Sequence, residues 1–369
     1  MADWAVFLLT FTRMTSMRRI LYGIVFFMMA AGLCCCQVGE KKKSSRRSGI
    51  SLLTPSASGR AYELLVVVDE DLWERPAGRA LDSVLDTDVP GLPQSERCFR
   101  VMHVAPRAYD ATMKLVRNII MVDIQNIYTQ TKLKSTQNVY SYPQSILTIQ
   151  APDEASFEEF VGRMGQTIID YFNHAELNRQ IGVLETSHSS MVSETVREMF
   201  GYDVWVPAEL KSAKRGEDFF WAGTNAATRD MNYVIYSYPY TDINVFTKEG
   251  FVAKRDSFMR ENIPGSREGM YMATDSLFTN VKSFRNNGEY VFEARGLWKI
   301  KGDMMGGPYV SQARVDEVNQ RVVVQEIFIY SPDTSKRNLV YQMEASLYTL
   351  QMPSKDNETK VETPEVEPE

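Results

Sequence analysis

The chain has 369 residues, of which 44% are hydrophobic and 24% are charged, and its net charge at pH 7 is −6. This length suits about two domains with sizeable cores, and the composition is that of an ordinary globular protein. The negative charge, together with the lack of a long basic stripe, argues against nucleic acid as the partner.

The first part of the chain predicts a signal peptide. The basic residues Arg18 and Arg19 are followed by fourteen uncharged residues, 20–33, and then by three cysteines. A basic start, a short apolar segment and small residues at its end are typical of such signals. The apolar segment is shorter than the roughly 20 residues of a transmembrane helix. Residues 1–16 fit poorly ahead of it, which indicates that Met17 is the true start.

The cysteines at the end of the signal indicate lipidation. A lipobox has Leu three residues before the modified Cys and a small residue just before it, and Cys36 has Leu33 and Cys35 in those places. Cys34 and Cys35 stay as alternatives, and an ordinary signal peptide with a cysteine-rich end is the other interpretation. The prediction is a signal peptide over 1–36 and a lipid anchor in the outer membrane. The protein is expected to face the periplasm, with the cell surface as the alternative.

Residues 37–58 are polar and basic and predict a flexible tether. The first domain is expected over 59–200. Its expected strands are 62–68, 98–104, 119–124 and 139–150, and its expected helices are 72–85, 106–116 and 153–172. A further helix, expected to link the two domains, carries Leu177, Ile181, Leu184, His188, Met191 and Thr195 at alternating spacings of four and three.

The second domain, 201–352, is predicted to be antiparallel. Its expected strands are 203–206, 219–222, 232–240, 290–300, 309–315 and 321–330, and its helices are 247–262 and a closing helix with the stripe Leu339, Met343, Leu347 and Leu350. The fold class is therefore α+β, with two α/β domains whose mostly antiparallel sheets are covered by helices. Residues 353–369 are acidic and predict a disordered tail.

The last three strands form the most strongly patterned stretch of the chain, a meander. Alternation along the first of them places Trp298 in the core and Lys299 and Lys301 in water. The run Gly306-Gly307-Pro308 predicts a turn in which at least one glycine has a positive φ.

Several residues are candidates for chemistry, and each has a structural alternative. Cys98 and His103 suggest a thiol–imidazole pair, but an odd separation on one strand puts them on opposite faces, which favours Cys98 as a core residue. His188 lies among serines and suggests a Ser/His nucleophile, or else a packed histidine on its helical stripe.

Metal binding is not predicted, and no cofactor is expected. The chain has three histidines, scattered and without metal-ligand spacing, and His174 stands alone near a helix start. The run Asp69-Glu70-Asp71 is read as the beginning of a helix rather than as a cation site.

Two groups of side chains are candidates for ligand binding. Tyr236, Tyr238 and Tyr240 alternate along one strand and share a face. With Trp205 and Trp221 they suggest a platform for stacking sugars, or else core. The second group places Arg295 with Glu293 on the polar face of the meander, with Glu326 on a neighbouring strand and Asp303 in the turn. An ion pair across the sheet and a ligand-reading cluster are the two interpretations.

Long blocks of the chain resemble a known family. They include GRAYELLVVVDEDLW, KRDSFMRENIPGSREG, EARGLWKIKGDMMGGPYVS and NQRVVVQEIFIYSP. The resemblance, from about Gly59 to Met352, is to a family of Bacteroidetes lipoproteins catalogued as domain of unknown function 4837. It implies a cell-envelope lipoprotein without an established activity, and it supplies no catalytic residues. The second domain is also similar, at the level of fold alone, to the PsbP/Mog1-type sandwich.

The sequence supports two hypotheses about function. The first is a cell-envelope lipoprotein that acts as a non-catalytic binding or assembly module, attached to the membrane through its lipid, with an envelope protein or a glycan as partner. It follows from the lack of a nucleophile elbow, metal spacing or phosphate loop in the sequence. The alternative is an envelope hydrolase with a site between the domains, near His188 or Arg295.

Lipidation can be tested on the protein made in its own host. Mass spectrometry of the mature N-terminus should find a diacyl- or triacyl-modified cysteine at Cys36, with nothing upstream retained. Replacing Cys36 by Ser should abolish the modification. An unmodified N-terminus at Gln37 or later would contradict the lipobox.

Overall fold

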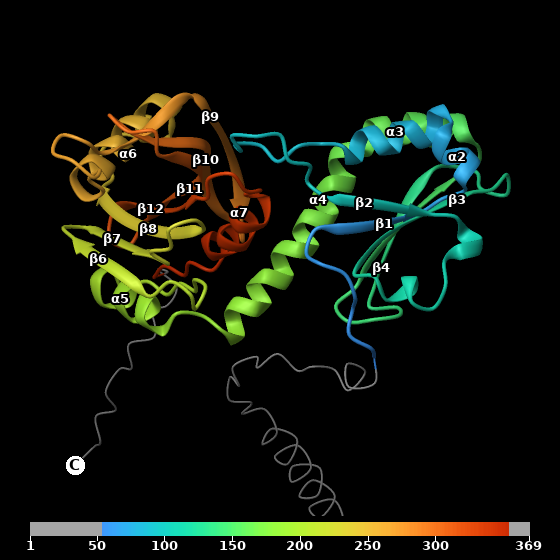
Figure 1. Ribbon diagram of the computed structural model, residues 1–369, viewed down its shortest axis with the longest axis horizontal. Coiled ribbons are helices and arrows are strands. Elements are labelled where there is room, and N and C mark those ends of the chain that lie inside the picture. The colour runs from blue at the N-terminus through green and yellow to red at the C-terminus, as the bar shows by residue number, and fades with distance from the viewer. Residues whose placement is uncertain (1–53, 354–369) are drawn as a thin grey trace, which may run out of the picture. The chain divides into compact units, whose positions relative to one another are not determined.

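A computed structural model describes residues 54–353 of the chain (Figure 1). From Pro55 onward the chain forms one compact unit that contains two β-sheets. The predicted signal peptide, the cysteine predicted to be lipidated and the acidic tail after Pro353 lie outside the described residues, as does most of the predicted tether.

The first sheet has five strands in the order β2-β1-β3-β5-β4. Their bounds are β1 Glu63–Val67, β2 Arg100–Val104, β3 Asn118–Ile124, β4 Lys132–Gln137 and β5 Ser145–Ala151. Only β4 is antiparallel to its neighbour, so the prediction of a mostly antiparallel sheet is wrong here. The reason is that long connections, one of them helical, carry the chain back between β1, β2 and β3, which allows parallel pairing. The continuous apolar run in β1 suits a strand covered on both faces.

The helices of the first half differ from the expected ones at their ends. The predicted helix 72–85 is two helices, α2 (Glu70–Glu74) and α3 (Pro76–Leu85), because Pro76 starts a new helix. The predicted helix 106–116 consists of two short 3₁₀ turns, Pro106–Ala108 and Met113–Leu115. No helix within residues 54–353 is long and apolar enough to cross a membrane.

The predicted linking helix is not a separate element. Helix α4 (Glu154–Thr186) runs unbroken for 33 residues, and Asp153 caps its start by accepting a hydrogen bond from the Ser156 N–H. The stripe from Leu177 to Thr195 is therefore split between α4 and α5 (Ser190–Phe200), which ends at Gly201 with φ +75°. The break falls at residues 187–189, because Ser189 has the extended backbone of an N-cap.

The second sheet has seven strands, all antiparallel, in the order β6-β7-β8-β12-β11-β10-β9. Their bounds are β6 Ser212–Gly216, β7 Phe219–Gly223, β8 Asp230–Pro239, β9 Met272–Asn286, β10 Glu289–Ile300, β11 Gly306–Asp316 and β12 Arg321–Tyr330. Helix α6 (Lys248–Asn262) packs on one face, while α5 and α7 (Arg337–Glu344) pack on the other. The predicted α+β class, meander and closing helix are confirmed.

Trp298 is buried in the core beneath α6, as predicted, and Lys299 is exposed. The predicted turn at Gly306 and Gly307 is wrong, because both lie in β11 and the positive φ of this turn, +86°, belongs to Gly302. The structure gives Gly307 another role. A Cβ there would lie 2.0 Å from the Ile329 carbonyl oxygen and 3.1 Å from the Trp298 indole nitrogen. The missing side chain lets the indole N–H donate to Ile329 O at 3.2 Å.

The core position of Trp298 yields a stability prediction. Trp298→Ala should lower the free energy of unfolding by about 3–5 kcal/mol, because it empties a large buried site. Lys299→Ala, one residue away, should cost less than about 1 kcal/mol, since its ion pair with Asp275 is at the surface. Urea unfolding of the two variants measures the difference, and equal losses would mean that the side chain of Trp298 is not a core residue.

Candidate functional site

Arg295 lies at the centre of a buried ion cluster on the α7 face of the second sheet. Its guanidinium is 3.1 Å from the Glu293 carboxylate on the same strand and 2.5 Å from the carboxylate of Glu344 on α7. Burial alone would lower the pKa of Arg295, but the Glu344 and Glu293 carboxylates raise it, so the guanidinium stays charged. The expected pair of Arg295 with Glu293 is therefore present, and Glu344 is a third member that the sequence did not suggest.

Glu326 does not join this cluster. It points to the opposite face of the sheet, where the guanidinium of Arg255 on α6 binds both of its oxygens, at 2.6 and 2.8 Å. Arg255 also donates to Thr274 at 2.8 Å and lies 4.2 Å above the ring of Tyr309. Both charged side chains are fully buried. The signal for Arg255 in the sequence is its spacing of four from Phe251 and Met259, which are buried on the same helical face.

Asp303 also lies apart from Arg295. It is exposed in the turn between β10 and β11, and its carboxylate accepts a hydrogen bond from the Met304 N–H at 2.6 Å. The proposed four-residue cluster of Arg295, Glu293, Glu326 and Asp303 is thus corrected. The structure brings together only the first two.

The tyrosines of β8 do not form an exposed platform. Tyr236 and Tyr238 share a face, as alternation predicts, but α6 covers them, and the ring of Phe258 stacks on Tyr236 at 4.4 Å. Tyr240 follows the end of β8 and packs on Phe246. The sugar-stacking interpretation of this strand is therefore wrong, and the core interpretation holds.

The residues considered for nucleophilic chemistry have structural contacts. Cys98 is buried, burial raises the pKa of its thiol, and the Tyr341 hydroxyl lies 3.7 Å from its sulfur. His103 instead stacks on Trp73 at 5.0 Å. His188 follows α4, where its Nδ1 is 2.8 Å from the Leu184 carbonyl oxygen and its ring stacks on Trp205 at 5.7 Å.

The acidic run at the start of α2 is part of a helix end. Asp69 is the N-cap residue, and Glu70 and Asp71 lie in the first turn. Across residues 54–353, no group of three or more His, Cys, Asp or Glu side chains is arranged to hold a metal ion.

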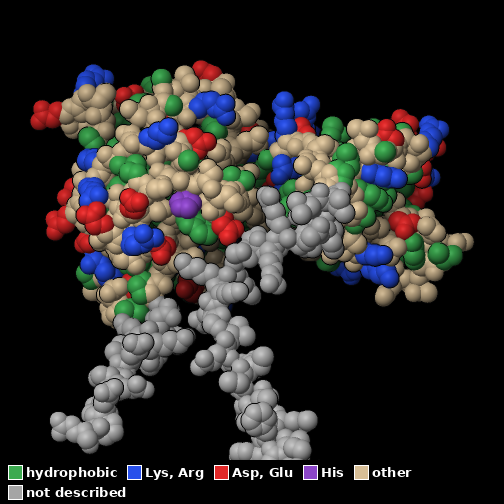
Figure 2. Space-filling model, turned by 90° about the horizontal axis from the view of Figure 1, so that it is seen from below, with side chains coloured by type: hydrophobic (Ala, Val, Ile, Leu, Met, Phe, Trp, Pro, Cys, Tyr) green, Lys and Arg blue, Asp and Glu red, His purple; other side chains and the backbone are tan. Residues whose placement is uncertain are grey.

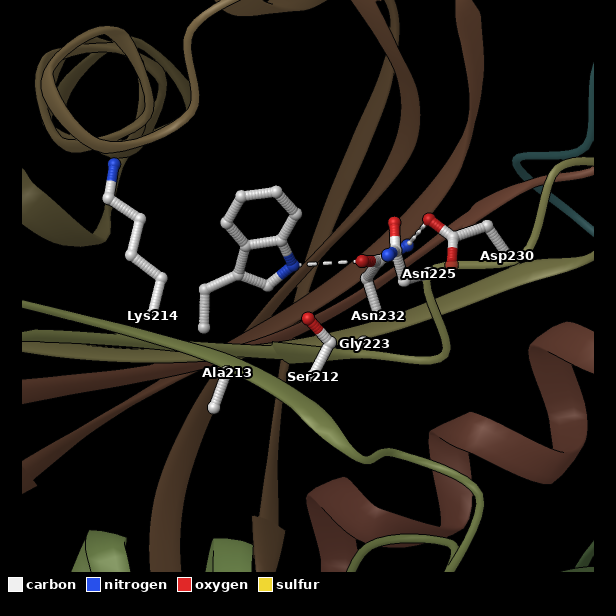
Figure 3. Close-up of a pocket in the computed structure, with 8 residues that line it drawn as sticks. Ser212, Ala213, Lys214, Gly223, Asn225, Asp230 and Asn232 are labelled. Carbon is white, nitrogen blue, oxygen red and sulfur yellow. Dashed lines mark hydrogen bonds between the residues drawn. The ribbon is translucent and has the colours of Figure 1, made fainter.

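A small pocket of about 90 Å³ lies at the edge of the second sheet, beside Trp221 (Figure 3). Its polar groups satisfy one another. The Trp221 indole N–H donates to Asn232 at 2.8 Å, the Asn232 amide donates to Asp230 at 2.9 Å, and Lys214 donates to the Asn262 carbonyl at the end of α6. The pocket has room for a few water molecules and leaves little for a ligand to replace.

A much larger cavity, of about 850 Å³, is the main candidate site, and we call it the cleft. One wall is a stripe on α4, a second is the tip of the β9–β10 hairpin, and the third is the loop after α3. The lining residues on α4 are Gln166, Ile169, Asp170, Asn173, His174, Leu177, Asn178 and Ile181. The hairpin tip contributes Lys282, Phe284, Arg285, Asn286 and Asn287, and the loop contributes Thr87, Asp88 and Pro90. This volume falls in the range of known small-molecule sites, about 300–1,000 Å³.

The floor of the cleft joins both sheets through α7 and the turn after it. It consists of Tyr62, Cys98, Arg295, Tyr341, Glu344 and Tyr348. The ring of Tyr341 stacks on Tyr62 at 4.3 Å. The Glu96 carboxylate, from the first half of the chain, accepts hydrogen bonds from the N–H groups of Lys336 and Arg337 at the start of α7, at 2.7 and 3.0 Å.

Two buried acceptor atoms of cleft residues have no hydrogen-bond partner. They are Oε2 of Glu344 and Oδ1 of Asn173. Burial raises the pKa of Glu344, Arg295 opposes this, and Glu293 adds to it. A buried acceptor without a partner costs about 1–3 kcal/mol. Both atoms are shielded from solvent, so a ligand donor reaches them only when the neighbouring side chains move aside. Of these residues, sequence analysis suggested only Arg295 for a site between the domains, because the others lie far apart along the chain without a shared pattern.

Comparison with known proteins identifies the second half. Residues 189–349 match the family model described as Domain of unknown function (DUF4837). The DUF4837 segment begins at the break between α4 and α5, and the resemblance noted in the sequence is confirmed over this part. Residues 57–185 match another model, Domain of unknown function (DUF8532), which differs from the family expected over this part of the chain.

Other comparisons add little to the DUF4837 and DUF8532 matches. No curated protein matches the chain. A crystal structure of a protein from Bacteroides thetaiotaomicron, at 1.50 Å resolution, is 12% identical with a TM-score of 0.19. The match covers 42% of this chain and 46% of that one, less than half of the neighbour's length. At this TM-score the likeness carries no argument about fold or function.

The buried pair of Arg255 and Glu326 yields a second stability prediction. Glu326→Gln should lower the free energy of unfolding by about 3–5 kcal/mol, because it removes the buried carboxylate that binds Arg255 and leaves only the more distant Asp256, at 3.8 Å, as a counter-ion. The matched control is Glu198→Gln, whose partner Arg215 is exposed, and its cost should stay below about 1 kcal/mol. Thermal or urea unfolding measures both, and a neutral Glu326→Gln would show that water reaches the pair.

Proposed function

We propose that the protein is a cell-envelope lipoprotein that acts as a non-catalytic binding or assembly module, with the cleft as its ligand site. The anchor is the lipid on Cys36, in the outer membrane and facing the periplasm or the cell surface. Support for the anchor comes from the order of basic residues, apolar segment and cysteines in residues 17–36.

The observation that carries the binding role is the cleft itself. It is large enough for a small ligand, and the Oε2 of Glu344 and the Oδ1 of Asn173 are acceptors without partners. Buried polar atoms in folded proteins are normally hydrogen-bonded, and those that are not call for an explanation such as an absent ligand or water. A ligand that supplies donors at these two atoms is such an explanation.

The contacts of the nucleophile candidates support binding rather than catalysis. A thiolate is the reactive form of cysteine, and burial holds the Cys98 thiol protonated by raising its pKa. His188 is engaged by the Leu184 carbonyl and by Trp205, and it is not among the residues that line the cleft. Cys98 thus meets the cleft as a protonated thiol, and His188 lies outside it.

One observation favours the alternative, an envelope hydrolase. Glu344 lines the cleft, and burial raises the pKa of its carboxyl group, a property that general acids share. Its Oε1 is, however, 2.5 Å from the Arg295 guanidinium, which holds that oxygen as an acceptor. The two functions differ in what happens to the bound material: a hydrolase shortens it, and a binding module returns it unchanged.

The cleft can be tested in living cells with a photoreactive amino acid. p-Benzoylphenylalanine in place of Phe284, at the cleft, should give covalent adducts with envelope material after irradiation. The control is the same substitution at Phe278, also on β9, which is 59% exposed and does not line the cleft. Adducts that are equal at the two positions, or seen only at Phe278, would contradict a ligand site in the cleft.

A further inference from the structure

We infer that the ligand of the cleft is a neutral, hydroxyl-rich molecule, of the class of short uncharged oligosaccharides. This inference rests on the proposed binding role and names the chemistry of its ligand. It follows from three properties of the lining: its side-chain amides, its balanced charges and its rings.

Side-chain amides are unusually frequent around the cleft. They come from the α4 stripe and the tip of the β9–β10 hairpin, and they comprise Gln166, Asn173, Asn178, Asn286 and Asn287. The amides of Asn178, Asn286 and Asn287 make no hydrogen bond to any described residue, and the Asn173 Oδ1 is also unpartnered. A primary amide offers donors and an acceptor side by side, and a hydroxyl group likewise both donates and accepts. A ligand with hydroxyls pointing in several directions would match amides on two facing walls.

The charged side chains around the cleft are balanced in sign, and each already has a partner within the protein. Asp88, Asp170 and Glu344 stand against Lys282, Arg285 and Arg295. Each of the six has a partner within the protein: Ser95, Gln166 and Arg295 donate to the acids, and Glu293, Gly288 and Glu344 accept from the bases. A site for a charged ligand normally presents an excess of the opposite sign. Over the face shown in Figure 2, basic and acidic side chains are likewise interspersed.

The two unpartnered acceptors set the polarity of the contacts at the floor. Oδ1 of Asn173 is an acceptor, and Oε2 of Glu344 is one when the carboxylate is ionised beside Arg295, so both favour a ligand that donates. A carboxylate or phosphate on the ligand would place acceptor against acceptor. An ammonium group would meet Arg295 next to Glu344, and its charge would be repelled. A neutral hydroxyl satisfies both atoms without either cost.

Rings supply surfaces for the apolar faces of a sugar. Phe284 is half-buried at the hairpin tip, His174 is exposed on α4, and Tyr348 lies on the floor. An aromatic face packs against C–H groups, while amides at its rim bind the hydroxyls. The groups come from three sides of the cavity. That arrangement suits a compact ligand with polar groups all round better than an extended peptide, which presents its backbone groups in a row.

The test uses the full-length protein in detergent and tetrasaccharides of matched length, measured by isothermal titration calorimetry. The neutral probes are cellotetraose, maltotetraose, mannotetraose and chitotetraose. The charged probes are tetragalacturonate and fully deacetylated chitotetraose. A capped tetraalanine serves as the peptide probe. At least one neutral tetrasaccharide should bind, at least tenfold more tightly than either charged one and than the peptide.

Variants locate the binding. Asn173→Leu and Glu344→Gln should each lower the affinity for the neutral tetrasaccharide by about tenfold, the effect of one lost hydrogen bond at a buried acceptor. Asn178→Ala, on the exposed part of the wall, should weaken it without a change in melting temperature, which guards against variants that merely unfold. Phe278→Ala, outside the cleft, should leave the affinity unchanged.

The outcomes separate the ligand class from the binding role. Binding of no neutral probe, tighter binding of a charged probe or of the peptide, or affinity unchanged in all three cleft variants would overturn the inference. If adducts still form at position 284 in cells, the cleft remains a binding site for another class of ligand. If adducts at position 284 are absent as well, the proposed function fails together with the inference.

Discussion

The contact between Arg295 and Glu344 determines where the last helix of the chain lies. A guanidinium removed from water requires carboxylates around it, and Glu293 and Glu344 supply them from the sheet and from α7. Because α7 also carries Tyr341, this contact places the ring that stacks on Tyr62 of the first half. The floor of the cleft thus depends on one buried cation. Another buried cation, Arg255, holds α6 to the other face of the same sheet in a similar way.

The meander was predictable from sequence because its residues alternate, but the faces of β12 were not. Trp298 and Lys299 follow the alternation of β10, so their burial could be read directly. The strand β12 is apolar on both faces, and its polar pair Gln325 and Glu326 points in opposite directions, so the sequence pattern gives no sign of which side Glu326 occupies. Only Arg255, from a distant helix, distinguishes that side. The prediction of strand direction in the first sheet was wrong for a related reason, since parallel pairing depends on partners far apart in the chain.

A site near Arg295 was one of the hypotheses from sequence, but the lining of the cleft could not have been predicted. Its lining runs from Tyr62 to Tyr348, and no periodic pattern joins segments so far apart. On α4 the lining stripe mixes amides, an acid and aliphatic side chains, which is also the composition of an ordinary half-exposed helix face. Arg295 was singled out for its place on a polar strand face, and the structure places it on the cleft floor. Glu344 and Asn173 matter because of atoms left without partners, which only three-dimensional packing reveals.

The hydrogen bonds from the start of α7 to Glu96 have a consequence for how the protein is made. The helix that completes the floor lies near the end of the described residues, and its cap comes from a loop synthesised some 240 residues earlier. The first sheet and α4 can therefore form while the rest is still being translated, but the cleft has no floor until residues 336–348 have emerged from the ribosome. The binding site is in this sense a late product of folding, and a polypeptide cut short before α7 would retain both sheets' strands and have no closed site to offer a ligand.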